Sequence, residues 1–356
     1  DRYCELSGAT KSSLKLVATP CIDDHQLNLT DFETKGVLSE NAARIVLKAL
    51  YLARLGRPDI LWTVNSLARE VTKWTIACDK RLYKLIAYIH HHGQRVITCY
   101  VGDPADQCWI SLFVDASFAG DLKDSKSTTG AYMCLTGPKT FVPLAWFCKK
   151  QGAVSHSSSE AEVIGLEAGT RIEGIPALQL WEEVIKVFCG EAPTTKQRDR
   201  HRSQPLTLPQ KLPTLHEPST QLTTPHNRLL QMLTEVDYIP TTIPPSDGRA
   251  KLYIFEDNES VIKMTIKGRS PTMRHITRTH RIDLDWLFER LQVDPGIFMK
   301  YVNTKRQIAD VLTKGNFTAD QWNKLLNLSQ ITTLSKQRLP APPITILLDA
   351  PLEPER

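Results

Sequence analysis

Four acidic residues stand in local sequence contexts that suit metal-dependent chemistry. They are Asp115 in ISLFVDAS, Glu162 in SSSEAEVIGL, Asp257 in LYIFEDNES and Asp310 in RQIADVLTKG. Three of them fall where a predicted strand ends or a predicted helix begins, so a rigid scaffold could aim them at one point. Two hard cations about 3.5–4 Å apart take oxygen ligands and stabilise both the attacking and the leaving oxygen of a phosphodiester. These residue types therefore indicate chemistry on a nucleic-acid backbone.

Asp115 and Asp257 each have a structural explanation as well. Acidic residues are disfavoured in strand centres, and either residue could simply form a turn at the end of its strand. At the strand-to-helix junction FEDN, Asp257 or Asn258 could also cap the following helix. The functional interpretation gains weight because parallel pairing would place the two strand ends side by side.

Glu162 and Asp310 have helix-based alternatives. Ser159 and Glu162 could form a capping box that only starts a helix, and Asp310 could favour a helix N-terminus through its charge. Glu160 competes with Glu162 for a catalytic role, but two residues correspond to about 200° of rotation on a helix, so both cannot face one metal site. Gly165 lies on the side of Glu162, where a small residue lets a helix approach a sheet, and this favours Glu162.

The periodicity of apolar residues predicts the elements that position these side chains. Residues 39–92 predict three consecutive helices, and 108–148 predict three short strands in an antiparallel meander. A long helix from Ser159 to about Val187, interrupted near Gly174–Pro176, follows. The remaining predicted elements are the strand KLYIFED, helices 259–266 and 281–292, the strand IFMKYV and helix 307–314. The pattern predicts an α/β protein with a mixed sheet flanked by helices, preceded by a small helical subdomain.

Proline-rich stretches set the domain boundaries. Nine of the chain's 22 prolines lie between Glu191 and Asp247, and five more lie from Pro340 to Pro354. We therefore predict a flexible insertion over 190–247 and a disordered tail over 327–356. The other predicted segments are an irregular N-terminal segment (1–38), a helical region (39–103) and an α/β domain made of 108–189 and 248–326.

Composition and cysteine usage narrow the class of protein only mildly. The chain is 41% hydrophobic and 23% charged, which is typical of globular proteins, and its net charge of +5 permits a nucleic-acid partner without requiring one. The eight cysteines show no C-x-x-C pair and no zinc-ligand spacing. No signal peptide or apolar run of about 20 residues is present. We expect an intracellular protein of the cytoplasm or nucleus, with reduced thiols and no membrane partner.

Four ordered motifs resemble the ribonuclease H domain of copia-type LTR retrotransposon Pol polyproteins. They are FVDASFAGDLKDSKSTTGAY, LAWFCKKQGAVSHSSSEAEVIGL, IFEDNESVI and IADVLTKG. Upstream, ALYLARLGRPDILWTVNSLAREV and RLYKLIAYIHH resemble the connection region that joins reverse transcriptase to ribonuclease H in these elements. The matches cover most of residues 39–325. The resemblance implies a ribonuclease H-like fold with a mixed five-stranded sheet.

The resemblance also implies an activity, namely hydrolysis of the RNA strand of RNA–DNA hybrids with two Mg²⁺ or Mn²⁺ ions. Asp115 matches the family's first-strand aspartate, and Glu162 matches the glutamate of its A-E-x-x-A-L pattern, in which Gly165 here replaces alanine. Asp257 matches the strand-end aspartate before Asn, and Asp310 matches the aspartate of L-A-D-I-L-T-K. The paired aspartates of a polymerase are absent, so no polymerase activity is expected from this chain.

Basic residues around these motifs are candidate contacts for the phosphates of a hybrid, although a solvated basic face explains them equally well. The candidates are Lys149, Lys150, Arg274, Arg278 and His280, with His275 in the same stretch. The reverse transcriptase portion of the same polyprotein is a second expected partner.

Two departures from the family pattern accompany the resemblance. Many cellular ribonucleases H carry a histidine in the loop before the last aspartate, whereas this loop, Asn303–Gln307, has none. The proline-rich insertion separates the second and third carboxylates, where relatives have a shorter link. Two other functions therefore remain open. The first is an inert fold that binds nucleic acid without cutting it. The second, ranked lower because such enzymes typically lack the A-E-x-x-x-L helix here, is a DNA nuclease or strand-transfer enzyme.

Overall fold

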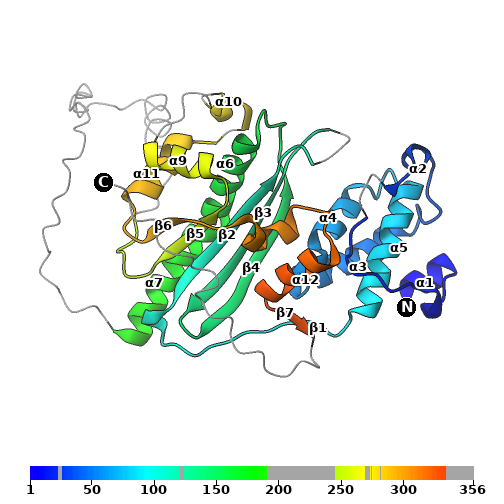
Figure 1. Cartoon of the computed structure of the whole chain (residues 1–356), viewed down its shortest axis with the longest axis horizontal. Coiled ribbons are helices and arrows are strands. Elements are labelled where there is room, and N and C mark those ends of the chain that lie inside the picture. Colours follow the sequence, from blue (N-terminus) through cyan, green and yellow to red (C-terminus); the bar gives the residue numbers. More distant parts are fainter. Residues whose placement is uncertain are drawn as a thin grey trace, which may run out of the picture. The chain divides into compact units, whose positions relative to one another are not determined.

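A mixed five-stranded sheet organises the protein in the computed structural model (Figure 1). The structure describes residues 1–22, 26–120, 124–190, 245–268, 273, 275–280 and 282–333. The strands, in the spatial order β4-β3-β2-β5-β6, are β2 (Trp109–Ser117), β3 (Thr128–Gly137), β4 (Thr140–Lys150), β5 (Leu252–Glu256) and β6 (Ile297–Tyr301). β2, β3 and β4 form the predicted antiparallel meander, whereas β5 pairs parallel with β2 and β6 pairs parallel with β5. The predicted α/β class with a five-stranded mixed sheet is confirmed.

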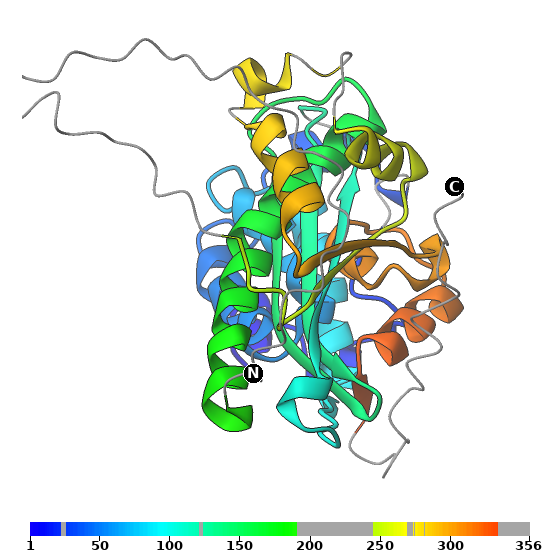
Figure 2. The same cartoon turned by 90° about the vertical axis from the view of Figure 1, so that its left-hand side faces the viewer.

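The two faces of the sheet are covered by different elements, which lie on opposite sides in Figure 2. Alternate residues of a strand point to opposite faces. Val114 of β2 therefore faces helix α6 (Ser158–Gly169), whose Gly169 approaches it closely. Its neighbour Phe113 packs in a core with Leu312 and Trp322. Both faces are apolar, and this explains why all but the end residues of β2 are buried.

The long helix predicted from Ser159 is two helices in the structure. A π turn, η5 (Thr170–Gly174), joins α6 to α7 (Ile175–Cys189). Pro176 has no amide hydrogen to donate, so the predicted interruption falls where the regular ladder of hydrogen bonds cannot continue. Gly174 at this point packs directly on Leu112 and Leu252.

The C-terminal elements include the predicted ones in their order, with one correction. The helices are α9 (Glu259–Lys267), α10 (Ile276–His280), α11 (Leu284–Val293) and α12 (Ala319–Leu328), of which α10 and α12 were not predicted. The predicted helix 307–314 is instead a short 3₁₀ turn, η8 (Ile308–Leu312), preceded by η7 (Thr304–Arg306). Ile308, Val311 and Leu312 are all buried, so tertiary packing rather than helix propensity determines this tight geometry.

The N-terminal region contains the three predicted helices, α3 (Ala42–Leu55), α4 (Leu61–Arg69) and α5 (Ile76–His91). The remaining elements there are α1 (Arg2–Ser7), η1 (Lys11–Ser13), α2 (Leu29–Glu33), η3 (Pro58–Ile60), β1 (Arg95–Ile97) and η4 (Ala105–Gln107). β1 pairs antiparallel with β7 (Ile331–Thr333). One continuous hydrophobic core joins Val64 and Leu85 of these helices to Tyr132 of the sheet and Trp322 of α12.

All described residues except Gly190 belong to one compact unit of the chain. The predicted insertion over 190–247 lies outside the described residues except at its ends. Of the predicted tail, only 327–333 are described, and they contain the end of α12 and strand β7. Among the described residues, no helix combines the length and the apolar character needed to cross a membrane.

Candidate metal centre

Three of the four predicted carboxylates meet beside the ends of two central strands. Oxygen atoms of Asp115, Glu162 and Asp257 lie within 4.8 Å of one another. Asp115 is on β2 and Asp257 directly follows β5, so the parallel pairing of these strands places the two side chains together. Asn258, rather than Asp257, caps α9 by accepting hydrogen bonds from Ser260 N and Val261 N. Asp257 is therefore not needed as a helix cap.

Glu162 reaches this cluster from α6, and the predicted capping box beginning at Ser159 is wrong. The N-cap is Ser157, whose side chain accepts a hydrogen bond from Glu160 N. Glu160, at the N3 position, accepts a hydrogen bond on its Oε2 from the amide of His156, the residue before the N-cap, at 3.0 Å. Glu162, two residues further on, is therefore turned toward Asp115, and the predicted separation of the two glutamates is confirmed.

Asp310 lies beside the cluster and is linked to it through a lysine. Lys314 Nζ is 2.5 Å from Asp310 Oδ1 and 3.5 Å from Asp115 Oδ1. Thr313 Oγ1 donates a hydrogen bond to Asp115 Oδ2. Asp310 does not join the group of three carboxylates that lie within 4.8 Å of one another. The short turn η8 and the residues after it thus place a negative, a positive and a hydroxyl group around Asp115.

Burial and mutual repulsion make Glu162, Asp257 and Asp310 hard to ionise. Burial raises the pKa of Glu162 well above its usual value, and the charges of Asp115, Glu256 and Asp257 raise it further. Burial and the charge of Asp115 raise the pKa of Asp310 to about 8, against the opposing effect of Lys314. The pKa of Asp257 is also raised, mainly by burial. Full ionisation of the cluster would therefore place more negative charge here than the surrounding protein compensates.

Two buried carboxylate oxygens have no hydrogen-bond partner among the described residues. They are Glu162 Oε2 and Glu256 Oε2. Buried polar atoms are normally hydrogen-bonded, so oxygens left without a partner beside excess negative charge fit a site that awaits a cation. A site made only of oxygen ligands suits Mg²⁺ or Mn²⁺ better than softer metals. The donor set therefore fits the hard ions that were predicted.

A cavity of about 520 Å³ opens beside Asp310 and Lys314. Its lining also includes Lys305, Lys324 and Phe317. Three lysines thus border a hollow next to the carboxylates, and one aromatic ring forms part of its wall. This combination suits a nucleic-acid strand, because lysine contacts phosphates and aromatic rings stack on bases or sugars.

The predicted phosphate contacts are placed as follows. Lys149 is exposed near the end of β4, and Lys150 is paired with Asp124 at 2.7 Å. The His280 side chain is only 3% exposed and contacts Glu160, which leaves little surface for a phosphate. Arg274 and the side chain of Arg278 lie outside the part of the chain that the structure describes.

Sequence reasoning did not assign roles to Glu256, Thr313 and Lys314. Glu256 had a detectable signal, since a glutamate at the end of an apolar strand is unusual. Thr313 and Lys314 follow Asp310 by three and four residues, a spacing that places side chains on one side of a helical turn. The spacing alone does not reveal that this side faces Asp115, which is about 200 residues earlier in the chain.

The fold and the site together define a mixed α/β protein with buried carboxylates that could hold metal ions. Over 151 residues the chain is 30% identical to the retrovirus-related Pol polyprotein from transposon RE1 of Arabidopsis thaliana. This match covers 42% of the chain and 10% of that polyprotein. No family model and no solved structure matches the chain. The relation supported is a distant one to retrotransposon Pol polyproteins.

Proposed function

We propose that the protein hydrolyses the RNA strand of RNA–DNA hybrids by two-metal catalysis, as part of a retrotransposon Pol polyprotein. The observation that carries the proposal is the convergence of Asp115, Glu162 and Asp257 within 4.8 Å, from three separate elements. The distant similarity to a Pol polyprotein supports the same conclusion. The reverse transcriptase portion of such a polyprotein is the partner expected to supply the hybrid.

Each carboxylate has a defined part in this proposal. Asp115, Glu162 and Asp257 would hold Mg²⁺ or Mn²⁺, with Asp310 as a fourth ligand beside them. Bound there, two such ions would supply a water of lowered pKa and charge stabilisation for the departing 3′ oxygen. Thr313 fixes the orientation of Asp115 through its hydrogen bond, and Lys314 keeps Asp115 and Asp310 close together through its contacts with both.

The cavity beside Asp310 provides a path for the substrate. Lys305 and Lys324 contact phosphates of one strand, while Phe317 offers a flat apolar surface. Selectivity for RNA comes from contacts to the 2′-hydroxyl and from the shape of the hybrid, because its deep, narrow major groove cannot be read by side chains. The protein thus cuts with little dependence on sequence.

We expect Asp257→Asn to lower cleavage of a labelled RNA–DNA hybrid by more than the 10–100-fold that is typical for loss of an outer partner of a metal site. The measurement is the rate of RNA-strand cleavage with Mg²⁺ and, separately, with Mn²⁺. Glu259→Gln is the matched control, because Glu259 is two residues away but exposed and paired with Lys263.

Binding of the uncut hybrid separates the possible outcomes. Asp257→Asn should still bind the hybrid, and duplex DNA should remain uncut by the unchanged protein. A folded protein that binds the hybrid but cuts it with neither ion would contradict the proposal and favour an inert nucleic-acid-binding fold. Cleavage of duplex DNA would favour a DNA nuclease.

A further inference from the structure

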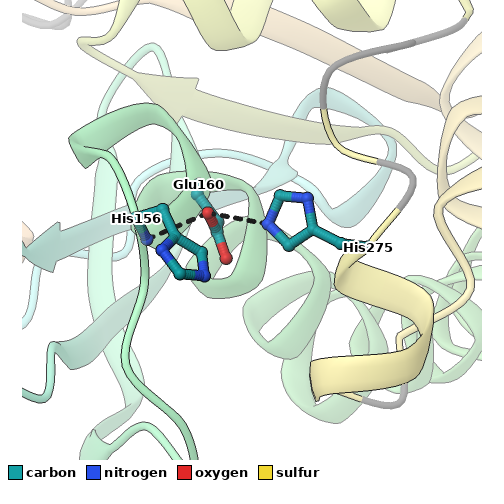
Figure 3. A group of neighbouring side chains, drawn as sticks. All are labelled: His156, Glu160 and His275. Atoms are coloured by element: carbon teal, nitrogen blue, oxygen red, sulfur yellow. Dashed lines mark hydrogen bonds and ion pairs between the residues drawn. The ribbon is translucent and has the colours of Figure 1, made fainter.

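A second group of metal-ligand side chains lies at the start of α6, turned away from Glu162. Ligand atoms of His156, Glu160 and His275 lie within 4.8 Å of one another (Figure 3). His156 precedes α6, and His275 precedes α10, so two segments far apart in the chain meet here. None of these side chains takes part in the carboxylate cluster described above.

Glu160 is held in place before any metal binds. Its side chain is only 2% exposed, its Oε2 accepts a hydrogen bond from His156 N, and its Oε1 lies 3.2 Å from His280 Nε2. His280 is itself buried. Many metal sites contain a ligating carboxylate whose far side is hydrogen-bonded by a second residue.

His275 directs a ring nitrogen at the same carboxylate. Its Nε2 is 3.2 Å from Glu160 Oε2, yet this buried nitrogen makes no hydrogen bond of good geometry within the described residues. The ring of His156 lies next to that of His275, with centroids 5.3 Å apart. Figure 3 shows both rings beside the Glu160 carboxylate. Three groups thus surround one point: the buried His275 nitrogen, which makes no hydrogen bond among the described residues, the fixed Glu160 carboxylate and the exposed His156 imidazole.

We propose that His156, Glu160 and His275 bind a zinc ion, with a fourth position open to water. Zinc–nitrogen and zinc–oxygen bonds of about 2.0–2.2 Å place neighbouring ligands of a tetrahedral ion roughly 3.4 Å apart. The distance between His275 and Glu160 is already close to this value, and exposed His156 is free to adjust. Imidazole ligands select zinc over Mg²⁺, whereas the oxygen-only carboxylate cluster has the opposite preference. The two sites therefore take different metals.

The ion joins α6 to the segment that contains α10. Glu160 and His280 are 120 residues apart in the chain, and the link between them includes the insertion. A metal that closes so long a loop stabilises the folded state, because the unfolded chain does not hold its ligands together. α6 also presents Glu162, so zinc steadies the helix that carries one of the proposed catalytic carboxylates.

The test uses the full chain, freed of metal with a chelator and then held in excess Mg²⁺ to occupy the carboxylate cluster. Titration calorimetry with Zn²⁺ should give one tight site per chain, and Co²⁺ should give the visible absorption of a tetrahedral complex. The thermal midpoint should rise with Zn²⁺. These readouts do not depend on RNA cleavage, so they are independent of the function proposed above.

Three variants and one control decide the outcome. His156→Ala, at an exposed position that is safe for folding, and His275→Ala should each weaken zinc binding at least tenfold. His280→Ala should weaken it about 10–100-fold, as an outer partner does. His90→Ala, exposed at the end of α5, should change nothing. Unchanged zinc affinity in both His156→Ala and His275→Ala, or no tight zinc binding by the unchanged protein, would show a hydrogen-bonded histidine–carboxylate cluster without a metal.

Discussion

Lys314 places a positive charge between two of the proposed metal ligands. It contacts both Asp115 and Asp310, and it is partly buried. Burial alone would lower the pKa of Lys314, but the charges of Asp115 and Asp310 outweigh this effect and raise it. Lys314 therefore stays charged and partly neutralises the cluster when no metal is bound.

We predict that Lys314→Met makes the folded protein more dependent on metal. Without the lysine, repulsion among the carboxylates should lower the thermal midpoint in EDTA, and Mg²⁺ or Mn²⁺ should raise it by more than in the unchanged protein. Thermal melts with and without metal measure both effects. Lys324→Met is the control, because Lys324 forms an exposed pair with Asp320. An equal response to metal in Lys314→Met and the unchanged protein would contradict this prediction.

The raised pKa of Asp310 predicts a specific pH dependence in the absence of metal. In the folded protein this carboxyl keeps its proton up to about pH 8, whereas in the unfolded chain it loses the proton near pH 4. The folded state thus holds an extra proton between these values. The contribution to stability is complete below about pH 4 and is lost as the pH rises toward 8, with a slope of at most about 1.4 kcal/mol per pH unit.

Asp310→Asn tests this directly. The free energy of unfolding in EDTA should fall less steeply between pH 4.5 and 8 in the variant than in the unchanged protein, as measured by denaturant titration at each pH. The difference between the two proteins isolates Asp310 from other groups such as Glu162, whose pKa is also raised. Parallel pH curves would rule out this explanation.

At the residue scale, the sequence predicted which carboxylates come together better than it predicted the side chains around them. Asp115 and Asp257 could be paired because parallel strand ends meet, and helical rotation separated Glu160 from Glu162. The histidine partners of Glu160 could not be predicted in the same way, since His275 and His280 are more than 100 residues away. Contacts across such distances depend on the complete fold, which local spacing does not encode.

At the scale of elements, close approach of backbones sets the position of the site. Gly130 of β3 pairs with Asp115 of β2, and a Cβ added to it would lie 2.7 Å from Thr313 Cγ2 and 2.8 Å from Leu312 Cβ. The absence of a side chain at Gly130 thus allows η8 to lie against the sheet. Gly165 of α6 is less confined, because an added Cβ would lie 3.4 Å from the Ala116 Cβ and 3.5 Å from Thr129 Cγ2.

These two glycines give a matched pair of substitutions. Gly130→Ala should cost about 1–3 kcal/mol of stability through overpacking and should reduce hybrid cleavage, because it displaces Thr313 from Asp115. Gly165→Ala should be tolerated, or should add about 0.5–1 kcal/mol through better helix propensity. Denaturant unfolding and cleavage assays measure both. A neutral Gly130→Ala would show that η8 can shift without affecting the site.

Elements with a clear pattern of apolar residues were predicted correctly. The helices α3–α5 have a period of 3.6, and the strands of the meander β2–β4 are short apolar runs bounded by turn residues. Both predictions are confirmed. The apolar residues of 307–314 matched a helical period, yet they form a 3₁₀ turn that is buried on several sides. A short apolar run carries too little periodicity to distinguish these structures, so packing decides between them.

At the scale of the whole molecule, a buried polar network fastens the helical region to the C-terminal helix. Arg57 and Asp59 form a buried ion pair at 2.8 Å. Tyr88 OH donates a hydrogen bond to Asp59 Oδ2 and accepts one from Trp322 Nε1 of α12. The network therefore connects η3, α5 and α12 inside the shared hydrophobic core.

Removing Asp59 should destabilise the whole unit. Asp59→Ala leaves the charge of Arg57 buried without its partner, which costs about 3–5 kcal/mol. Lys263→Ala, which removes an exposed pair with Glu259, should cost at most about 0.5 kcal/mol. Denaturant unfolding followed by tryptophan fluorescence and by circular dichroism should give coincident transitions for both variants. Separate transitions would show that the helical region and the sheet unfold independently.

Trp62 of α4 contacts Gly315, which directly follows Lys314. This contact bears on what happens when the chain is cut into two fragments. Gly315 leaves no space for a side chain against the Trp62 ring, so the helical region forms part of the support behind the lysine that contacts Asp115 and Asp310. A protease cut in the exposed connection around Ala105–Gln107 would therefore leave two fragments that remain bound through the core they share. Expressed separately, the same two fragments should complement each other, and neither is expected to work alone.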